Sequence, residues 1–291
     1  MDYEPYLRLA FFVGTLLAMG VWEQLAPRRA LRVGRGWRWA SNLALVAINT
    51  LLVRSLAALG AVGIAITAAE RGWGLFNNVA LPAWAAALLS FVLLDLAIYL
   101  QHVMFHAVPV LWRLHRVHHA DLDVDVTTGL RFHTVEILLS LGIKAAAIVL
   151  FGPPAVAVLA FEVALNATSL FNHSNVALPA WLDRALRLVV VTPDMHRIHH
   201  SALREETNSN YGFNLPWWDY LLGTYRNVPA HGHERMTLGV AEIRDARAAD
   251  RLPAMLAMPF VALGRESREK TQPTARRAIV SGVRRTAGRG T

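Results

Sequence analysis

Long apolar segments dominate the amino-acid sequence and restrict the folds that it can adopt. Of the 291 residues, 54% are hydrophobic, and they gather in blocks at 9–26, 43–69, 79–100 and 137–171. About 20 apolar residues are enough for a helix to cross the hydrocarbon core of a bilayer. Three such blocks within the first 100 residues predict three membrane-spanning helices rather than the buried core of a soluble protein.

The fourth block differs because Gly152-Pro153-Pro154 interrupts it near its middle. The block is too long for one crossing, and proline breaks a helix. We expect a helical hairpin that enters the membrane and returns, with each arm near the lower limit for spanning. The sequence therefore predicts an all-α integral membrane protein with about four transmembrane elements, namely three spans and one re-entering hairpin.

Arginine placement predicts the orientation of these elements. The segment after the first block is rich in arginine, and basic loops stay in the cytoplasm. Counting crossings from there places 71–78 outside and both 101–136 and 172–291 on the cytoplasmic side. We therefore expect a histidine-rich cap on the cytoplasmic face. The arginines that carry this prediction are Arg28, Arg29, Arg32, Arg35 and Arg38.

Clustered histidines are the second unusual feature. Ten of the 12 histidines lie between positions 102 and 200, and eight of these form three clusters. Residues at i, i+3 and i+4 share one face of a helix, so each cluster can direct two or three imidazoles at one point. The clusters are His102-x-x-x-His106, His115-x-x-His118-His119 and His196-x-x-His199-His200.

Such clusters indicate a metal site, because many structural imidazoles in one interior would each need hydrogen-bond partners. Zinc sites use three or four protein ligands, so eight clustered histidines with His173 or His133 suit two ions. The chain has no cysteine, which leaves nitrogen and oxygen ligands. Imidazole accepts zinc, copper, iron or nickel, so the ligand type does not select the metal.

Asp95 stands out as a carboxylate inside the third apolar block. It lies seven residues before His102, two helical turns away on the same face, with Tyr99 one turn along. One interpretation is a carboxylate that orients a metal-bound imidazole. The other is an internal ion pair with Arg54, and the sequence does not decide between them.

Five motifs follow one another between 85 and 226, and together they resemble the fatty acid hydroxylase/sterol desaturase superfamily. The resemblance implies a catalytic domain at 85–226, preceded by transmembrane helices at 1–84 and followed by an extension at 227–263 and a basic tail at 264–291. The motifs are Asp95-x-x-x-Tyr99-x-x-His102-x-x-x-His106, Leu111-Trp112-x-x-His115-x-x-His118-His119, Thr192-Pro193-x-x-His196-x-x-His199-His200, Asn208-x-Asn210-Tyr211-Gly212 and Asp219-x-x-x-Gly223-Thr224.

The resemblance implies a membrane-bound non-haem di-iron enzyme that hydroxylates or desaturates a lipid, such as a sterol or a fatty acyl chain. It implies O2 as a substrate and an electron-transfer partner of the ferredoxin, cytochrome b5 or reductase type. Iron enters through this resemblance alone, and zinc is expected as a substitute in purified protein because imidazole binds both metals.

The same resemblance assigns roles to individual residues. The eight clustered histidines are the implied iron ligands, with His173 as a further one. His133 is left open between a ligand and a group behind the ligands. The expected supporting groups are Asp95, Tyr99, Glu136, Asp194, Asn208 and Asn210.

The alternative function is a membrane protein that binds or transports metal without redox catalysis. Transport predicts polar positions along the helices, whereas the histidines stop at the helix ends. A zinc protease would need His-Glu-x-x-His, which the sequence lacks. The tail at 264–291 holds eight Lys or Arg and two Glu. We expect it to be disordered and to contact anionic lipid rather than nucleic acid.

The aromatic run 216–220 has two interpretations. Tryptophan and tyrosine concentrate where the membrane meets water, so the run is expected either at that boundary or packed within the cytoplasmic cap.

Overall fold

The computed structural model describes residues 4–56 and 60–262. Residues up to Phe260 form one compact unit, and the predicted basic tail at 264–291 lies outside the described residues. Within the described ranges the chain is helical, and pairing between extended segments is limited to isolated bridges such as Pro27 with Val176. The prediction of an all-α integral membrane protein is confirmed.

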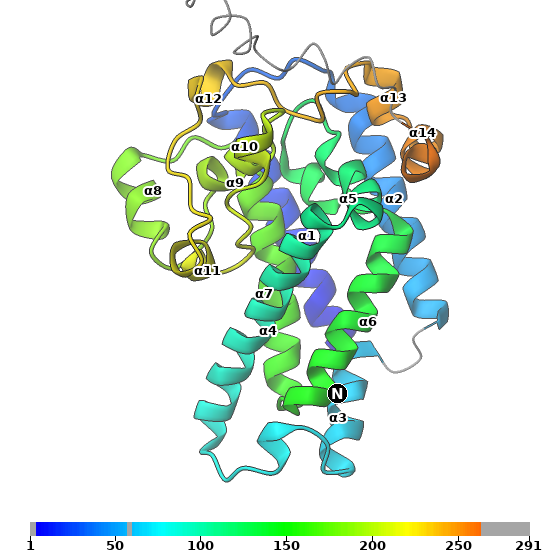
Figure 1. The fold of residues 1–291 in the computed structure, drawn as a ribbon, viewed down its shortest axis with the longest axis vertical. Coiled ribbons are helices and arrows are strands. Elements are labelled where there is room, and N and C mark those ends of the chain that lie inside the picture. The colour runs from blue at the N-terminus through cyan, green and yellow to red at the C-terminus, as the bar shows by residue number, and fades with distance from the viewer. Residues whose placement is uncertain (1–3, 57–59, 263–291) are drawn as a thin grey trace, which may run out of the picture. The chain divides into compact units, whose positions relative to one another are not determined.

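Five helical segments in the described part of the chain are long and apolar enough to cross a membrane. They correspond to the three predicted spans and the two arms of the predicted hairpin (Figure 1). The segments are α1 (Glu4–Leu25), α2 with α3 (Arg35–Leu56 and Gly60–Glu70), α4 (Ala83–Ala107), α6 (Thr134–Phe151) and α7 (Ala155–His173).

The hairpin turns where its sequence requires a left-handed residue. Helix α6 ends at Gly152, whose φ of 63° is readily adopted only by glycine. Pro153 and Pro154 then end one helix and precede the next. A Cβ at Gly152 would lie 2.7 Å from the carbonyl oxygen of Trp73, so the turn packs tightly on the loop between α3 and α4. The hairpin therefore reaches the same end of the bundle as that loop.

A small apolar core joins α3, α4, α6 and α7. Its buried members include Ala65, Leu94, Ile148 and Phe161. Alanines at 61, 65 and 68 allow α3 to approach its neighbours closely, as small residues do between membrane helices. Many large apolar side chains on the same helices remain exposed, which suits a bundle surrounded by lipid.

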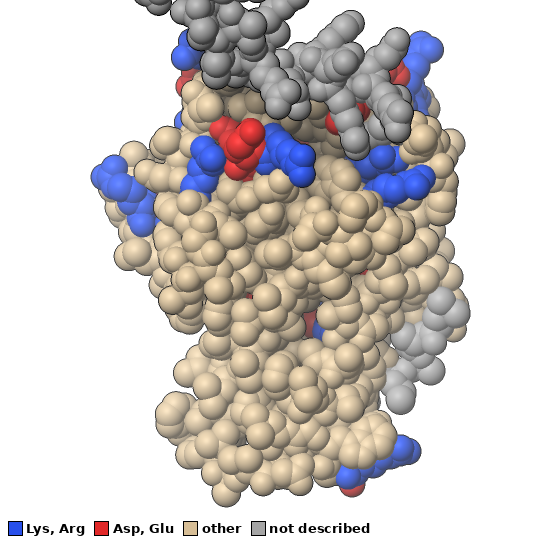
Figure 2. Space-filling model, viewed as in Figure 1, with Lys and Arg blue, Asp and Glu red and all other residues tan. Residues whose placement is uncertain are grey.

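Short helices gather at the end of the bundle opposite the hairpin turn (Figure 1). On the face shown in Figure 2, charged side chains lie mainly at the two ends, and the surface between them is almost uncharged. These short elements are α5 (Pro109–His119), η2 (Val126–Leu130), α8 (Ala180–Leu186), α9 (Pro193–His199), α10 (Arg204–Thr207), α11 (Trp217–Leu221), α12 (Gly232–Arg235), α13 (Ala246–Asp250), α14 (Leu252–Ala257) and η3 (Met258–Phe260). One more short helix, η1 (Leu75–Asn77), lies instead beside the hairpin turn.

Arg38 anchors this cap to the membrane helices. Two of the arginines used for the topology, Arg35 and Arg38, belong to the first turn of α2 rather than to a loop. The fully buried Arg38 guanidinium forms ion pairs with Asp121 at 2.7 Å and Asp125 at 2.9 Å. These carboxylates follow α5 directly, so Arg38 fixes the chain as it leaves the second histidine cluster.

Candidate metal centre

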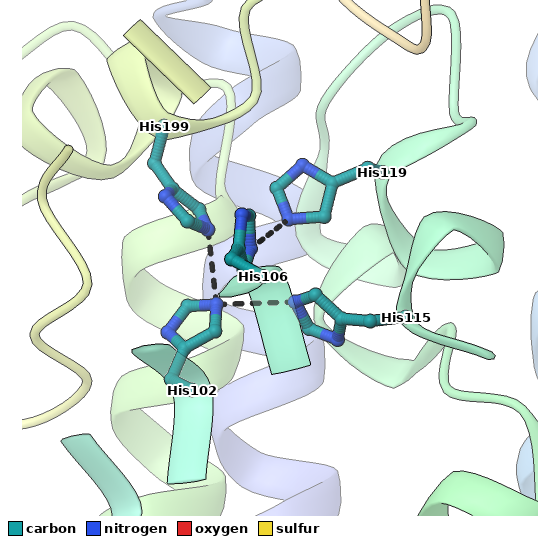
Figure 3. A group of neighbouring side chains, drawn as sticks. All are labelled: His102, His106, His115, His119 and His199. Atoms are coloured by element: carbon teal, nitrogen blue, oxygen red, sulfur yellow. Dashed lines mark hydrogen bonds between the residues drawn. The ribbon is translucent and has the colours of Figure 1, made fainter. Parts of the chain in front are cut away.

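Nine histidines converge in the cap where α4, α5, α7 and α9 meet. They form two groups, and within each group one ring nitrogen per residue lies within 4.8 Å of all the others. Figure 3 shows the imidazoles of the larger group turned toward one another. The five-histidine group contains His102, His106, His115, His119 and His199, and the four-histidine group contains His118, His173, His196 and His200.

Local sequence places each cluster at a helix end. His102 and His106 lie one turn apart at the end of α4. Pro109 starts α5, which ends on the second cluster at His119. The hydroxyl of Thr192 caps α9 by accepting a hydrogen bond from the Met195 N–H, and Pro193 occupies the first turn, where its missing N–H costs nothing.

Backbone carbonyls fix the tautomers of two ligands in the five-histidine group. The Nδ1 atom of His102 lies 2.8 Å from the Tyr211 carbonyl oxygen, and that of His199 lies 2.7 Å from the Ser209 carbonyl oxygen. A carbonyl only accepts, so each Nδ1 carries the proton and each Nε2 presents a lone pair. The two Nε2 atoms are 3.0 Å apart, and neither has a proton to share. A cation between them resolves this repulsion, so the donor set fits a metal ion.

Two side chains complete the support of this group. The Glu136 carboxylate lies 2.6 Å from Nδ1 of His115, whose Nε2 is 3.1 Å from that of His102. The Asn208 side-chain oxygen lies 3.3 Å from Nδ1 of His106. Hydrogen bonding of the second ring nitrogen orients a ligating imidazole and makes it more basic.

The four-histidine group is built differently. Nδ1 of His173 lies 2.7 Å from the Ser169 carbonyl oxygen, which leaves its Nε2 lone pair facing His118 at 3.1 Å and His196 at 3.0 Å. Among the described residues, Nδ1 of His118, Nδ1 of His196 and both ring nitrogens of His200 lack hydrogen-bond partners. Buried nitrogens without partners are costly in a protein interior, and metal coordination removes part of that cost.

Burial favours the neutral form of five of these histidines. Desolvation, with repulsion from neighbouring imidazoles, lowers the pKa of His118, His119 and His196 well below 6.5. The pKa of His199 and that of His200 are lowered well below 6.5 for the same reasons. A neutral imidazole has the lone pair that a metal ion needs, so these rings are ready to coordinate at neutral pH.

Comparison with known proteins supports a family assignment. Residues 87–224 match the family model described as Fatty acid hydroxylase. This match and the curated relatives support the fatty acid hydroxylase/sterol desaturase superfamily. No solved structure matches the chain.

Several curated relatives of the chain are lipid-modifying enzymes. Ornithine lipid hydroxylase OlsE of Rhizobium tropici is 28% identical over 88% of the chain and 76% of its own length. Human alkylglycerol monooxygenase is 29% identical over 62% of the chain, which spans 40% of that relative. Human cholesterol 25-hydroxylase is 30% identical over 49% of the chain, which spans 53% of it.

Asp95 and Tyr99, both parts of the superfamily motif on α4, lie behind the metal centre without touching a histidine of either group. Asp95 accepts a hydrogen bond from the Trp218 indole at 2.8 Å and pairs neither with Arg54 nor with His102. The Tyr99 hydroxyl bonds to Thr224 at 2.9 Å. Both residues therefore hold the 208–224 segment against α4.

Asp194 and Asn210 stabilise the segments that carry histidines. Asp194 lies in the first turn of α9 and forms ion pairs with Arg28 at 3.0 Å and with Arg197. The Asn210 side-chain amide donates hydrogen bonds to the carbonyls of Met195 and Arg226 at 2.9 Å each. The backbone of Asn210 adopts a positive φ of 53°. Neither side chain contacts an imidazole of the two groups.

His133 belongs to neither group. Its Nδ1 accepts a hydrogen bond from the Val135 N–H at the start of α6, and its Nε2 donates to the Leu256 carbonyl at 3.2 Å. Both ring nitrogens are thus used in holding helix ends. The structure brings together nine of the ten histidines that were considered as ligands.

Some supporting groups carry no signal in the sequence. The carbonyls that orient His102, His173 and His199 belong to the backbone, so any residue type supplies them. Phe132 stacks on His118 at 4.4 Å with an interplanar angle of 13°. Asp219 was visible only as part of a motif. Its carboxylate accepts hydrogen bonds from the backbone N–H groups of Tyr211 and Gly212 at 2.8 Å each. These bonds position the Tyr211 carbonyl, which orients His102.

Proposed function

We propose that this protein is a membrane-bound di-iron oxygenase that hydroxylates, or alternatively desaturates, a membrane lipid with O2. The observation that carries the proposal is the pair of histidine groups whose ring lone pairs converge at one end of a transmembrane bundle. Lipid hydroxylases and monooxygenases among the relatives support an oxidoreductase acting on lipid.

Each histidine group would hold one iron ion, because each offers at least four imidazole nitrogens. When bound, the iron pair supplies the activation of O2 for attack on an unactivated C–H bond. The protein holds the ions through neutral imidazoles, and the Glu136 carboxylate fixes His115 and adds negative charge. Burial of His118 (1% exposed) and His196 (0%) keeps bulk water away from the four-histidine group.

The lipid substrate, the electron donor and the membrane side are further parts of the proposal. The ends of the apolar helices adjoin the histidines, which supports a substrate that approaches from the bilayer. We place the metal centre on the cytoplasmic face, as the arginines near the first span indicate. A cytoplasmic ferredoxin, cytochrome b5 or reductase would then supply electrons. A tag on the C-terminus should be accessible only from the cytoplasm, and access from the opposite side would contradict this topology.

Comparative lipidomics of host cells with and without the protein tests the function. We expect a lipid class whose mass rises by one oxygen, or falls by two hydrogens, only when the protein is present. Cells that carry His199→Ala at equal protein abundance are the matched control and should lack the product. An unchanged lipid profile, together with metal uptake that depends on the protein, would favour the metal-transport alternative, which the lipid-modifying relatives do not support.

A further inference from the structure

A second apolar surface lies outside the five spanning segments, on the short helices α8 and α11. Large side chains there remain exposed to an extent unusual for a soluble protein, for example Trp181 at 67% and Leu221 at 73%. We call this surface the α8–α11 patch. It consists of Trp181, Leu188, Val189, Trp217, Leu221 and Leu222.

Two hydrogen bonds join α11 to the residues that follow α8 and satisfy the polar side-chain atoms of Trp217 and Tyr220. The Trp217 indole N–H donates to the Leu188 carbonyl at 2.7 Å, and the Tyr220 hydroxyl donates to the Arg187 carbonyl at 3.0 Å. Since these polar atoms already have partners, the exposed remainder of each aromatic side chain is apolar. Such satisfaction is what a lipid environment requires.

A third hydrogen bond sets the depth of α11 along the bundle. The Trp218 indole donates to Asp95, which lies midway between Ala83 and Ala107 at the ends of α4. At 1.5 Å per residue, this point is about 18 Å from either end of α4. In Figure 1, α11 lies farther than α9 from the capped end of the bundle. This hydrogen bond therefore ties α11, which carries the exposed Leu221, to the middle of a membrane-crossing helix.

Basic side chains lie next to the patch. Arg28, Arg184 and Arg187 line a surface pocket of about 400 Å³ beside α8, together with Asp183 and Asp194. Arg184 is exposed and lies three residues from Trp181 on the same short helix. Arginine beside an exposed tryptophan is typical of the boundary between lipid headgroups and acyl chains.

We propose that the α8–α11 patch is inserted into the bilayer leaflet that surrounds the histidine-bearing half of α4, with Arg184 at the level of the lipid phosphates. The cap then rests partly in the membrane instead of standing wholly in water. The occupant of the patch is lipid because the Trp218–Asp95 hydrogen bond ties α11 to the middle of a spanning helix and because Arg184 borders the patch. This inference does not depend on the proposed enzymatic function.

Fluorescence quenching in liposomes tests the insertion. Because the sequence contains no cysteine, a single-cysteine variant is labelled at one position only. Leu221→Cys and, as a second site, Trp181→Cys would be labelled with bimane in the full-length protein. Nitroxide attached to lipid acyl chains reports contact with lipid, and aqueous iodide reports contact with water. Leu88→Cys, at a residue on α4 that is 58% exposed, is the lipid-facing control, and Glu205→Cys on α10 is the water-facing control.

We expect both patch labels to be quenched by the lipid nitroxide as strongly as the Leu88→Cys label. Iodide should quench them about tenfold less than the Glu205→Cys label, because a charged ion is excluded from hydrocarbon. Iodide quenching equal to that at Glu205→Cys would overturn the proposal. Protection from both quenchers would also overturn it, since a second copy of the chain or another protein would then cover the patch.

Discussion

The two histidine groups differ in the hydrogen bonds made by the ring nitrogens that face away from the centre of each group. In the five-histidine group, four ring nitrogens that face away from the centre contact Tyr211, Ser209, Glu136 or Asn208. In the four-histidine group only His173 has such a partner among the described residues, the Ser169 carbonyl. Hydrogen bonds therefore orient the rings of the larger group, whereas packing orients those of the smaller one, as with Phe132 on His118. The larger group is the more preorganised site.

Removing one ligand from each group gives the largest expected effect. His199→Ala in the five-histidine group and His118→Ala in the four-histidine group should each lower the metal content from about two ions per chain to about one. Both variants should lose lipid oxidation while remaining in the membrane. Elemental analysis of purified protein measures the stoichiometry, with His231→Ala as an exposed control. Full metal content in both variants would contradict the two-group description.

Glu136→Gln tests the carboxylate that, among the described residues, bonds a histidine of the five-histidine group and has no counterpart in the other group. The amide still reaches His115 but lacks the negative charge, so the affinity of that group for metal should fall about 10- to 100-fold. Titration with a competing chelator measures the change, and Glu205→Gln, at an exposed position on α10, is the matched control. An unaltered affinity would mean that the 2.6 Å contact in the structure does not tune the metal.

Chelation of the unaltered protein compares the two groups directly. The four-histidine group should lose its ion first, roughly tenfold faster, because fewer of its rings are held by hydrogen bonds. Metal release should therefore show two phases. The single-ion variants His118→Ala and His199→Ala assign each phase to a group. A reversed order would show that packing holds the smaller group as firmly as hydrogen bonds hold the larger one.

Tyr99→Phe should have the smallest effect. Thr224 donates its proton to Asp219 at 2.6 Å, so the Tyr99 hydroxyl donates to Thr224. Losing this bond should cost about 1 kcal/mol, about fivefold in the affinity of the five-histidine group only. Chelator titration of both groups measures the change. Tyr225→Phe removes a hydroxyl that contacts Asn227 and Arg187 instead and serves as the control.

Spacing predicted the histidine clusters but not how they divide. Each i, i+4 pair stays in one group, as His102 with His106 and His196 with His200 do. Residues three apart do not, since His196 and His199 belong to different groups. Neighbouring residues on a helix point about 100° apart, so an adjacent pair such as His199 and His200 suits two different ions. Which group each ring joins depends on how α5, α7 and α9 meet.

The residues expected to support the histidines show which features of the site a local sequence pattern can predict and which it cannot. Glu136 and Asn208 were expected behind the ligands, and the structure places both on imidazoles. Asp95 was expected there or on Arg54, yet it bonds Trp218, because the 208–224 segment folds back onto α4. His133 looked like a possible ligand by residue type alone, but it caps α6. In each case the sequence showed a polar or ionisable side chain, but it did not show which residue that side chain would bond.

The sequence by itself determined the membrane helices, the hairpin turn and the clustering of imidazoles. All three depend on residue type and on spacing within single helices or turns, which act locally. Only the tertiary structure decided the division into groups of five and four histidines and the carbonyls of Tyr211 and Ser209 that orient two of them. Those two contacts join different elements through backbone atoms that every residue shares, so no pattern of side chains encodes them.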